Sequence, residues 1–143
     1  MADETLDTRP TFSPASTADH PLSPHLQIWK WAVTMATSIL QRATGIAMYA
    51  GSILLVLWLL SAAISDRFYQ TVTGLLGSPL GIIVLVGFTW AQMFHMANGI
   101  KYLIWDSGKL LELETAKKAG WFVIIASFVL TALIWALGLG LKG

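Results

Sequence analysis

The sequence predicts an all-α integral membrane protein with three transmembrane helices and an N-terminal segment on the cytoplasmic side. Of its 143 residues, 55% are hydrophobic and 12% are charged, whereas an ordinary soluble domain has about 25% charged residues. Three apolar segments are each long enough to cross a hydrocarbon core of about 30 Å, which takes about 20 helical residues. A soluble helical bundle is the alternative, but the near absence of charge in these segments disfavours it.

The N-terminal segment differs in composition from everything that follows it. Residues 1–24 are rich in Thr, Ser, Pro and Asp and have no periodic apolar face, so we expect a mobile polar tail ahead of a membrane-anchor domain at residues 25–143. The segment lacks the apolar stretch of a secretory signal, and Asp3, Glu4 and Asp7 are untypical of a mitochondrial presequence. The composition favours a bacterial inner membrane over a mitochondrial one.

The three spans are expected at about residues 43–65, 80–104 and 119–141. The first and third contain no charged residue, and the second contains only Lys101, near its end. Lysine and arginine divide seven to two between the two sides that three spans define, so the positive-inside rule places the N-terminus in the cytoplasm and the C-terminus outside. So small a bundle can barely enclose a site by itself. We therefore expect a heteromeric helix bundle in the lipid bilayer, built with partner chains.

His95 lies well inside the second span, in the segment HMANGIKYLIWD. It precedes Trp105 by about ten residues, which places it on the order of 15 Å below the cytoplasmic interface. A neutral imidazole hydrogen-bonded to a neighbouring helix is one interpretation, and a ligand or proton relay is the other. The row of residues four apart reads Gly87, Ala91, His95, Gly99. Small residues around an imidazole leave a slot for a flat macrocycle such as haem, or simply let two helices pack closely.

A second polar group stands at the entrance of the first span, in the segment SILQRATG. Ser38, Gln41, Arg42 and Gly45 follow i, i+3, i+4, i+7 spacing and so share one helical face. Arg42 alone would be read as a side chain that extends to the lipid headgroups. With a hydroxyl one turn before it and an amide beside it, a pocket for a polar ligand head is the better interpretation.

Composition also limits the chemistry of the chain. There is no cysteine, which excludes disulfides, a Cys-ligated iron-sulfur cluster and a thiolate nucleophile within it. A transporter or channel would usually show broken helices or several charges inside the membrane. A pure assembly anchor without a cofactor stays open, and no nucleic-acid partner is expected.

Two long motifs resemble the signatures of the cytochrome b subunits of succinate dehydrogenase, respiratory complex II. The segment HPLSPHLQIWKWAVTMATSILQRATG resembles their N-terminal signature, R-P-x-S-P-H-L-x-I-Y, then T, then S-I-x-H-R-x-[ST]-G. The segment HMANGIKYLIWD resembles their second signature, H-x-x-x-G-[IV]-R-H-[LM]-x-[WM]-D. The resemblance covers residues 20–106 with the motifs in the correct order and spacing.

The resemblance implies a membrane-anchor subunit of a succinate:quinone oxidoreductase. Such a subunit pairs with a second small anchor subunit, shares one haem b with it, and docks the iron-sulfur and flavoprotein subunits on the cytoplasmic side. Succinate would be oxidised in the flavoprotein, and electrons would pass through iron-sulfur centres to ubiquinone. By motif position, His95 would be an axial ligand of the haem iron, with the second ligand on the partner anchor. Ser38 and Arg42 would be the polar pair at the quinone site.

Three positions depart from the family pattern. Gln41 stands where histidine is common, Lys101 where arginine is common, and Tyr102 where histidine is common. The resemblance places all three near the haem propionates, so Gln41 and Tyr102, with Arg42 and Gly99, are expected to help bind the cofactor. Glutamine and tyrosine can still donate hydrogen bonds to a carboxylate but add no positive charge. Lysine cannot make the two parallel hydrogen bonds to a carboxylate that the guanidinium of arginine makes.

Overall fold

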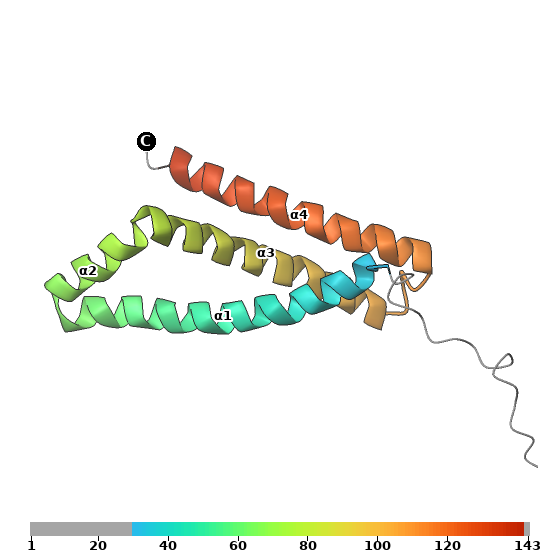
Figure 1. Cartoon of the computed structure of the whole chain (residues 1–143), viewed down its shortest axis with the longest axis horizontal. Helices are drawn as coiled ribbons and strands as arrows, with labels where there is room; N and C mark the ends of the chain where they lie inside the picture. The colour runs from blue at the N-terminus through green and yellow to red at the C-terminus, as the bar shows by residue number, and fades with distance from the viewer. Residues whose placement is uncertain (1–29, 142–143) are drawn as a thin grey trace, which may run out of the picture. The chain divides into compact units, whose positions relative to one another are not determined.

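A computed structural model describes residues 30–141 of the chain, and within them the secondary structure is entirely helical (Figure 1). The four helices are α1 (Val33–Ile64), α2 (Asp66–Leu76), α3 (Pro79–Asp106) and α4 (Leu113–Gly140). Helices α1, α3 and α4 are long and apolar enough to cross a membrane. The predicted all-α membrane protein with three spans is thus confirmed. The predicted tail at residues 1–24 lies outside the described residues.

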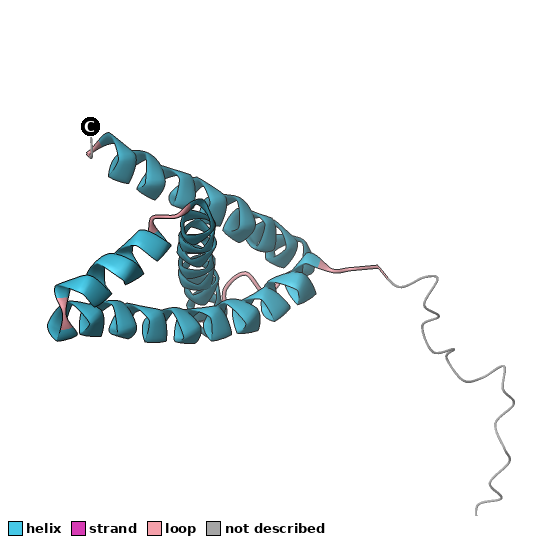
Figure 2. Cartoon of the chain, turned by 60° about the vertical axis from the view of Figure 1, so that its left-hand side comes forward, coloured by secondary structure: helices cyan, strands magenta, loops and turns pink. Residues whose placement is uncertain are grey.

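Helix α3 lies between α1 and α4 and runs antiparallel to both. Gln41 of α1 contacts His95, and Trp90 of α3 donates a hydrogen bond to Ser127 of α4 over 3.1 Å. Helices α1 and α4 approach each other only where the first turns of α1 meet the second turn of α4. Figure 2 shows the two helices converging there and diverging toward their far ends. The described helices therefore form an open bundle with α3 at its centre.

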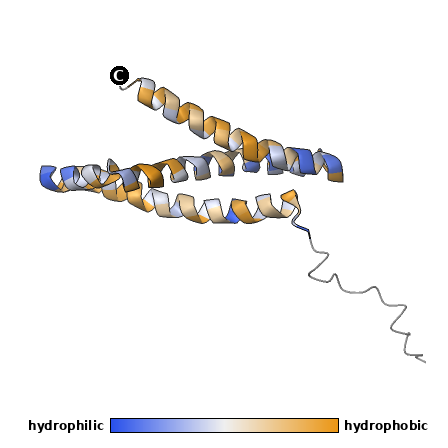
Figure 3. Ribbon diagram, turned by 45° about the horizontal axis from the view of Figure 1, so that its top comes forward, coloured by the Kyte–Doolittle hydropathy of each residue, from blue (hydrophilic) through white to orange (hydrophobic). Residues whose placement is uncertain are grey.

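The contacts between helices are made mainly by small and polar side chains. Four hydrophobic residues are buried within the described part, namely Ala91, Phe94, Ala116 and Val123. The buried polar residues outnumber them and are Thr37, Thr44, Ser61, Asn98, Lys101, Ser127 and Thr131. Most large apolar side chains point outward, and Figure 3 shows hydrophobic residues along all three long helices. Such a surface requires lipid or partner helices to cover it.

Two glycines allow the long helices to approach closely. A Cβ at Gly51 of α1 would collide with the ring of Phe88 in α3. A Cβ at Gly120 of α4 would lie 2.7 Å from Cγ1 of Val33 in α1, which is too short for a real contact. Small residues at such positions are typical of packed membrane helices, because little apolar driving force remains between helices in lipid.

Helix α2 occupies the connection between the first two spans and is not predicted by the span pattern. Ser65 begins it, since its side-chain oxygen accepts a hydrogen bond from the Phe68 N–H over 3.3 Å. Trp58 of α1 donates to the Thr73 hydroxyl over 3.3 Å and its ring lies 6.1 Å from that of Tyr69. These contacts fold α2 back onto the end of α1.

The helices extend beyond the predicted spans. Helix α1 begins at Val33, ten residues before the predicted start near residue 43, and α4 begins at Leu113 rather than near residue 119. The predicted starts mark the last charged residue before each apolar segment. The helix itself begins earlier, because it can include polar residues whose side chains stay on its surface. Ser38, Gln41 and Arg42 therefore lie inside α1, in its second and third turns.

Candidate functional site

His95 contacts α1 through both nitrogens of its imidazole. Its Nδ1 lies 3.2 Å from the Thr44 hydroxyl oxygen, and its Nε2 lies 3.2 Å from Nε2 of Gln41. The side chain is half-buried. A Cβ at Gly45 would lie 3.4 Å from Cε1 of His95, so glycine leaves space beside the ring. A hydrogen-bonded contact with a neighbouring helix, one of the two interpretations of this histidine, is therefore present.

Hydrogen bonds on the Nε2 side of His95 fix which groups donate. Asn98 Nδ2 donates to the backbone carbonyl of Thr37 over 3.2 Å and to Oε1 of Gln41 over 2.9 Å. A carbonyl can only accept, so the amide nitrogen of Asn98 must face it. Gln41 consequently turns its oxygen to Asn98 and its NH2 group to His95. The Nε2 of His95 therefore accepts a hydrogen bond and carries the lone pair.

Hydrogen bonds on the opposite side of the ring agree with this assignment. The Thr44 hydroxyl donates to the backbone carbonyl of Leu40 over 2.7 Å, so its single proton is used. Its oxygen can then only accept from Nδ1–H of His95. His95 is thus the neutral tautomer with hydrogen on Nδ1 and a lone pair on Nε2, which is the form that binds a metal through Nε2.

Lys101 is a buried cation one turn beyond Asn98. It is 4% exposed, and its ammonium donates a hydrogen bond to the Thr37 hydroxyl over 3.1 Å. The same ammonium lies 4.7 Å from the ring centroid of Trp105 and 4.9 Å from that of Tyr102. Among the described residues, no carboxylate pairs with Lys101. One hydroxyl and two aromatic faces stabilise the charge instead.

Two buried polar atoms beside Lys101 have no hydrogen-bond partner within the described residues. They are an acceptor, Oδ1 of Asn98, and a donor, Nε1 of Trp105. Buried polar atoms are usually paired, so these two unpaired atoms set this part of the α1–α3 contact apart. A largely apolar groove of about 590 Å³ between α3 and α4 also reaches Lys101.

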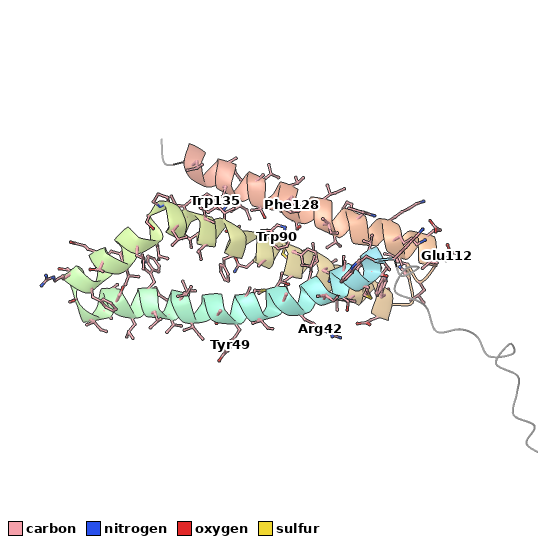
Figure 4. All side chains as sticks on the ribbon, viewed as in Figure 1. Arg42, Tyr49, Trp90, Glu112, Phe128 and Trp135 are labelled. Atoms are coloured by element: carbon pink, nitrogen blue, oxygen red, sulfur yellow. The ribbon has the colours of Figure 1, made fainter. Side chains whose placement is uncertain are left out.

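The structure divides the predicted polar face of α1. Gln41 and Gly45 face His95 of α3. Ser38 is half-buried and Arg42 is exposed, and neither side chain makes a hydrogen bond or ion pair with the residues that the structure describes. Figure 4 shows Arg42 on the side of α1 turned away from α3. Residues three and four apart cover a broad arc of the helix surface. The four residues of the predicted face therefore lie partly inside and partly outside the contact between α1 and α3.

The row of small residues through His95 is only partly open. A Cβ at Gly87 or at Gly99 would meet no atom within 4 Å, whereas Ala91 is 5% exposed. Gly99, one turn from His95, therefore leaves open space beside α3. The slot predicted from the sequence is open at its two ends and closed by packing in the middle.

Thr44 and Asn98 belong to the site but are not predicted from the sequence. Their signal is present: Thr37, Gln41 and Thr44 recur at i, i+4 and i+7 within an apolar helix, and Asn98 follows His95 by three residues. Polar residues on one face of a membrane helix usually bind another helix. Within residues 30–141, no three residues among His, Cys, Asp and Glu come together.

Comparison with known proteins gives one consistent family. The family model for the succinate dehydrogenase/fumarate reductase transmembrane subunit matches residues 16–134. The succinate dehydrogenase cytochrome b556 subunit of Paracoccus denitrificans is 38% identical over 115 residues, which cover 80% of this chain and 88% of that protein.

Two further relatives agree with this family. The cytochrome b556 subunit of Rickettsia prowazekii is 35% identical over 115 residues, covering 80% of this chain and 90% of that protein. The mitochondrial succinate dehydrogenase cytochrome b560 subunit of Sus scrofa is 39% identical over 110 residues, covering 76% of this chain and 65% of that protein.

Proposed function

Since the chain belongs to the succinate dehydrogenase/fumarate reductase transmembrane subunit family, we propose that it is a cytochrome b membrane anchor of a succinate:quinone oxidoreductase. In this role it binds one haem b together with a second small anchor subunit and helps to form the site that reduces ubiquinone. Iron-sulfur and flavoprotein subunits, docked on the cytoplasmic side, deliver the electrons of succinate. The cytochrome b names of the relatives support the haem.

The observation that carries this proposal is the tautomer of His95. Iron binds the lone pair of a neutral imidazole, and hydrogen bonding leaves that lone pair on Nε2. One lone pair cannot serve both iron and Gln41, so with haem bound the Gln41 amide would be free to donate to a propionate carboxylate. When bound, haem b supplies a carrier for single electrons. A Cβ at Gly99, one turn from His95, would meet no atom within 4 Å, so this residue leaves open space near the proposed ligand.

Other residues of the site are proposed to hold the propionates. Tyr102 of α3 can donate a hydrogen bond from its hydroxyl to a propionate. Arg42 of α1 can form an ion pair with a propionate carboxylate. The other two histidines of the chain, His20 and His25, precede the first span in the sequence, so we propose that a second ligand to the iron would come from the partner anchor.

Ser38 and Arg42 are proposed to form the ubiquinone side of the site. Both side chains are available for a ligand, because neither makes a hydrogen bond or ion pair with the residues that the structure describes. Reduction places negative charge on a quinone oxygen before protons complete the quinol. A hydroxyl donor and a fixed cation beside that oxygen stabilise the charge as it develops.

The chain is proposed to lie in a bacterial inner membrane with its N-terminus in the cytoplasm. The seven-to-two distribution of lysine and arginine supports this orientation. The bacterial relatives from Paracoccus and Rickettsia support the compartment.

An anchor without haem is the competing function, and one observation favours it: both ring nitrogens of His95 already have partners in α1. An absorption spectrum of the purified complex, oxidised and then reduced, separates the two functions. We expect the bands of a low-spin b-type haem, and their absence would support the plain anchor.

The His95→Leu variant extends this test to the ligand. We expect the low-spin spectrum to be lost from the assembled complex, while the His20→Leu control retains it. An assembled His95→Leu complex with an unchanged spectrum would show that His95 is not the ligand.

A further inference from the structure

We propose that Thr44 is a positioning residue that holds the proton on Nδ1 of His95 and so sets the donor strength of the nitrogen that binds iron. This inference rests on the proposed haem function. It goes beyond that function because it assigns a role to a residue that is not itself a ligand. The contact is 3.2 Å long, and Thr44 is 3% exposed.

The hydrogen bonds around His95 form a chain that is anchored at both ends. One end is the backbone carbonyl of Thr37, which accepts from Asn98, and the other is that of Leu40, which accepts from Thr44. Both carbonyls belong to α1, and neither can reverse its role. The directions of all bonds between them are therefore fixed, and the proton of His95 stays on Nδ1.

Only one of the two partners of His95 can persist when iron is bound. Gln41 donates to Nε2, so it competes with iron for the same lone pair. Thr44 accepts from Nδ1–H and does not compete with the metal. Among the described residues, Thr44 is thus the group that continues to orient the ring after ligation.

The contact has a chemical consequence for the metal. A ligating imidazole whose other N–H donates to an acceptor is a more basic ligand, because the hydrogen bond increases electron density on the ring. A more basic ligand stabilises the oxidised iron over the reduced iron and lowers the reduction potential. Removing the Thr44 hydroxyl should therefore raise the potential of the haem.

Substitutions at Thr44 test this role in the purified, assembled complex. Thr44→Val replaces the hydroxyl with a methyl group of similar size, Thr44→Ala removes volume as well, and Thr44→Ser keeps the hydroxyl. Thr131→Val is the matched control, because the buried Thr131 hydroxyl also donates to a carbonyl of its own helix, over 2.7 Å, with no histidine beside it. The readouts are a redox titration of the haem and the electron paramagnetic resonance spectrum of its oxidised form.

We expect Thr44→Val and Thr44→Ala to shift the midpoint potential upward and to move the resonance positions of the oxidised haem. Thr44→Ser and Thr131→Val should match the wild type. Loss of haem from both hydroxyl-free variants, with haem retained in Thr44→Ser, would be a stronger form of the same result. Haem that is unchanged in Thr44→Val, or lost from Thr44→Ser as well, would overturn the role of Thr44. A wild-type complex without haem bands would instead overturn the proposed function.

Discussion

Lys101 of α3 donates a hydrogen bond to the hydroxyl of Thr37 in α1, and both side chains are buried. The Thr37 hydroxyl in turn donates to the backbone carbonyl of Thr34 over 3.0 Å. A Cβ at Gly120 of α4 would lie 3.8 Å from Cγ2 of Thr37, so all three long helices meet at this threonine. The contact joins the bundle at the end where α1 and α4 converge.

Removing one partner of the hydrogen bond between Lys101 and Thr37 should lower the stability of the complex more than removing both partners. Thr37→Val leaves the buried Lys101 ammonium without a hydrogen-bond acceptor among the described residues, and we expect a loss of about 1.5–3 kcal/mol in stability. The double variant Thr37→Val with Lys101→Met should recover part of that loss, because no buried charge remains. Thermal unfolding of the purified complex measures both. A Thr37→Val complex as stable as the wild type would contradict the importance of this bond.

Gly51→Ala should disrupt the packing of α1 against α3. The added methyl group collides with the Phe88 ring, and overpacking of this kind costs about 1–3 kcal/mol. We expect a lower melting temperature of the complex and partial recovery when Phe88→Leu is added. Gly138→Ala is the control, since a Cβ there meets no atom within 4 Å. Equal effects of the two alanine substitutions would argue against a specific collision.

Ser38→Ala and Arg42→Leu should each depress succinate-to-quinone turnover about ten- to hundredfold. Losing one hydrogen bond to a charged species costs about 1.5–3 kcal/mol, which corresponds to such factors. Reduction of a soluble dye that takes electrons from the flavoprotein should stay near wild type, because in the proposed complex succinate is oxidised in another chain. Ser52→Ala is the control, as its exposed hydroxyl bonds to the backbone of its own helix.

Two outcomes would contradict the assignment of Ser38 and Arg42. Full retention of quinone reduction would remove both residues from the site. An equal loss of the quinone and dye activities would show that the complex fails to assemble, which would give these residues a structural role instead.

A reporter fused after Lys142 should report the outer side of the membrane. Three spans place the two ends of the chain on opposite sides, and the proposed orientation, from the excess of lysine and arginine, has the N-terminus inside. A second reporter inserted at Gly108, in the connection between α3 and α4, should give a cytoplasmic signal. A cytoplasmic signal after Lys142 would refute the charge argument or the number of spans.

The sequence predicts the long helices well because length and lack of charge suffice to identify a membrane span. Helix α2 has only 11 residues and includes Asp66, Arg67 and Gln70, so no such criterion detects it. The start of α1 at Val33 is also missed, because Arg42 ends the uncharged stretch although the helix continues through it.

The candidate site is predicted only in part, for a different reason. His95 stands out because an imidazole is rare in an apolar segment. Thr44 and Asn98 are ordinary in a membrane helix, and their importance depends on the rotation and axial offset of α1 against α3. The spacing of residues along a single helix gives no information about how that helix is rotated and shifted against its neighbour. The same limit explains why Gln41 contacts His95 whereas Arg42, its neighbour in sequence, points away.

The small and polar side chains between the helices invert the usual pattern of mutational tolerance. In a soluble protein the large apolar residues are the constrained ones, whereas here Leu57 and Leu59 lie outside the described helix contacts and, wherever lipid covers them, can be exchanged for other apolar residues at little cost in stability. Adding even a methyl group at the buried Ser61 or Ser127 would meet a neighbouring helix or strain the local hydrogen bonds. Neutral substitutions in this chain should therefore accumulate at its most hydrophobic, outward-facing positions. The hydrophobicity of a residue alone is then a poor guide to whether its substitution is harmful.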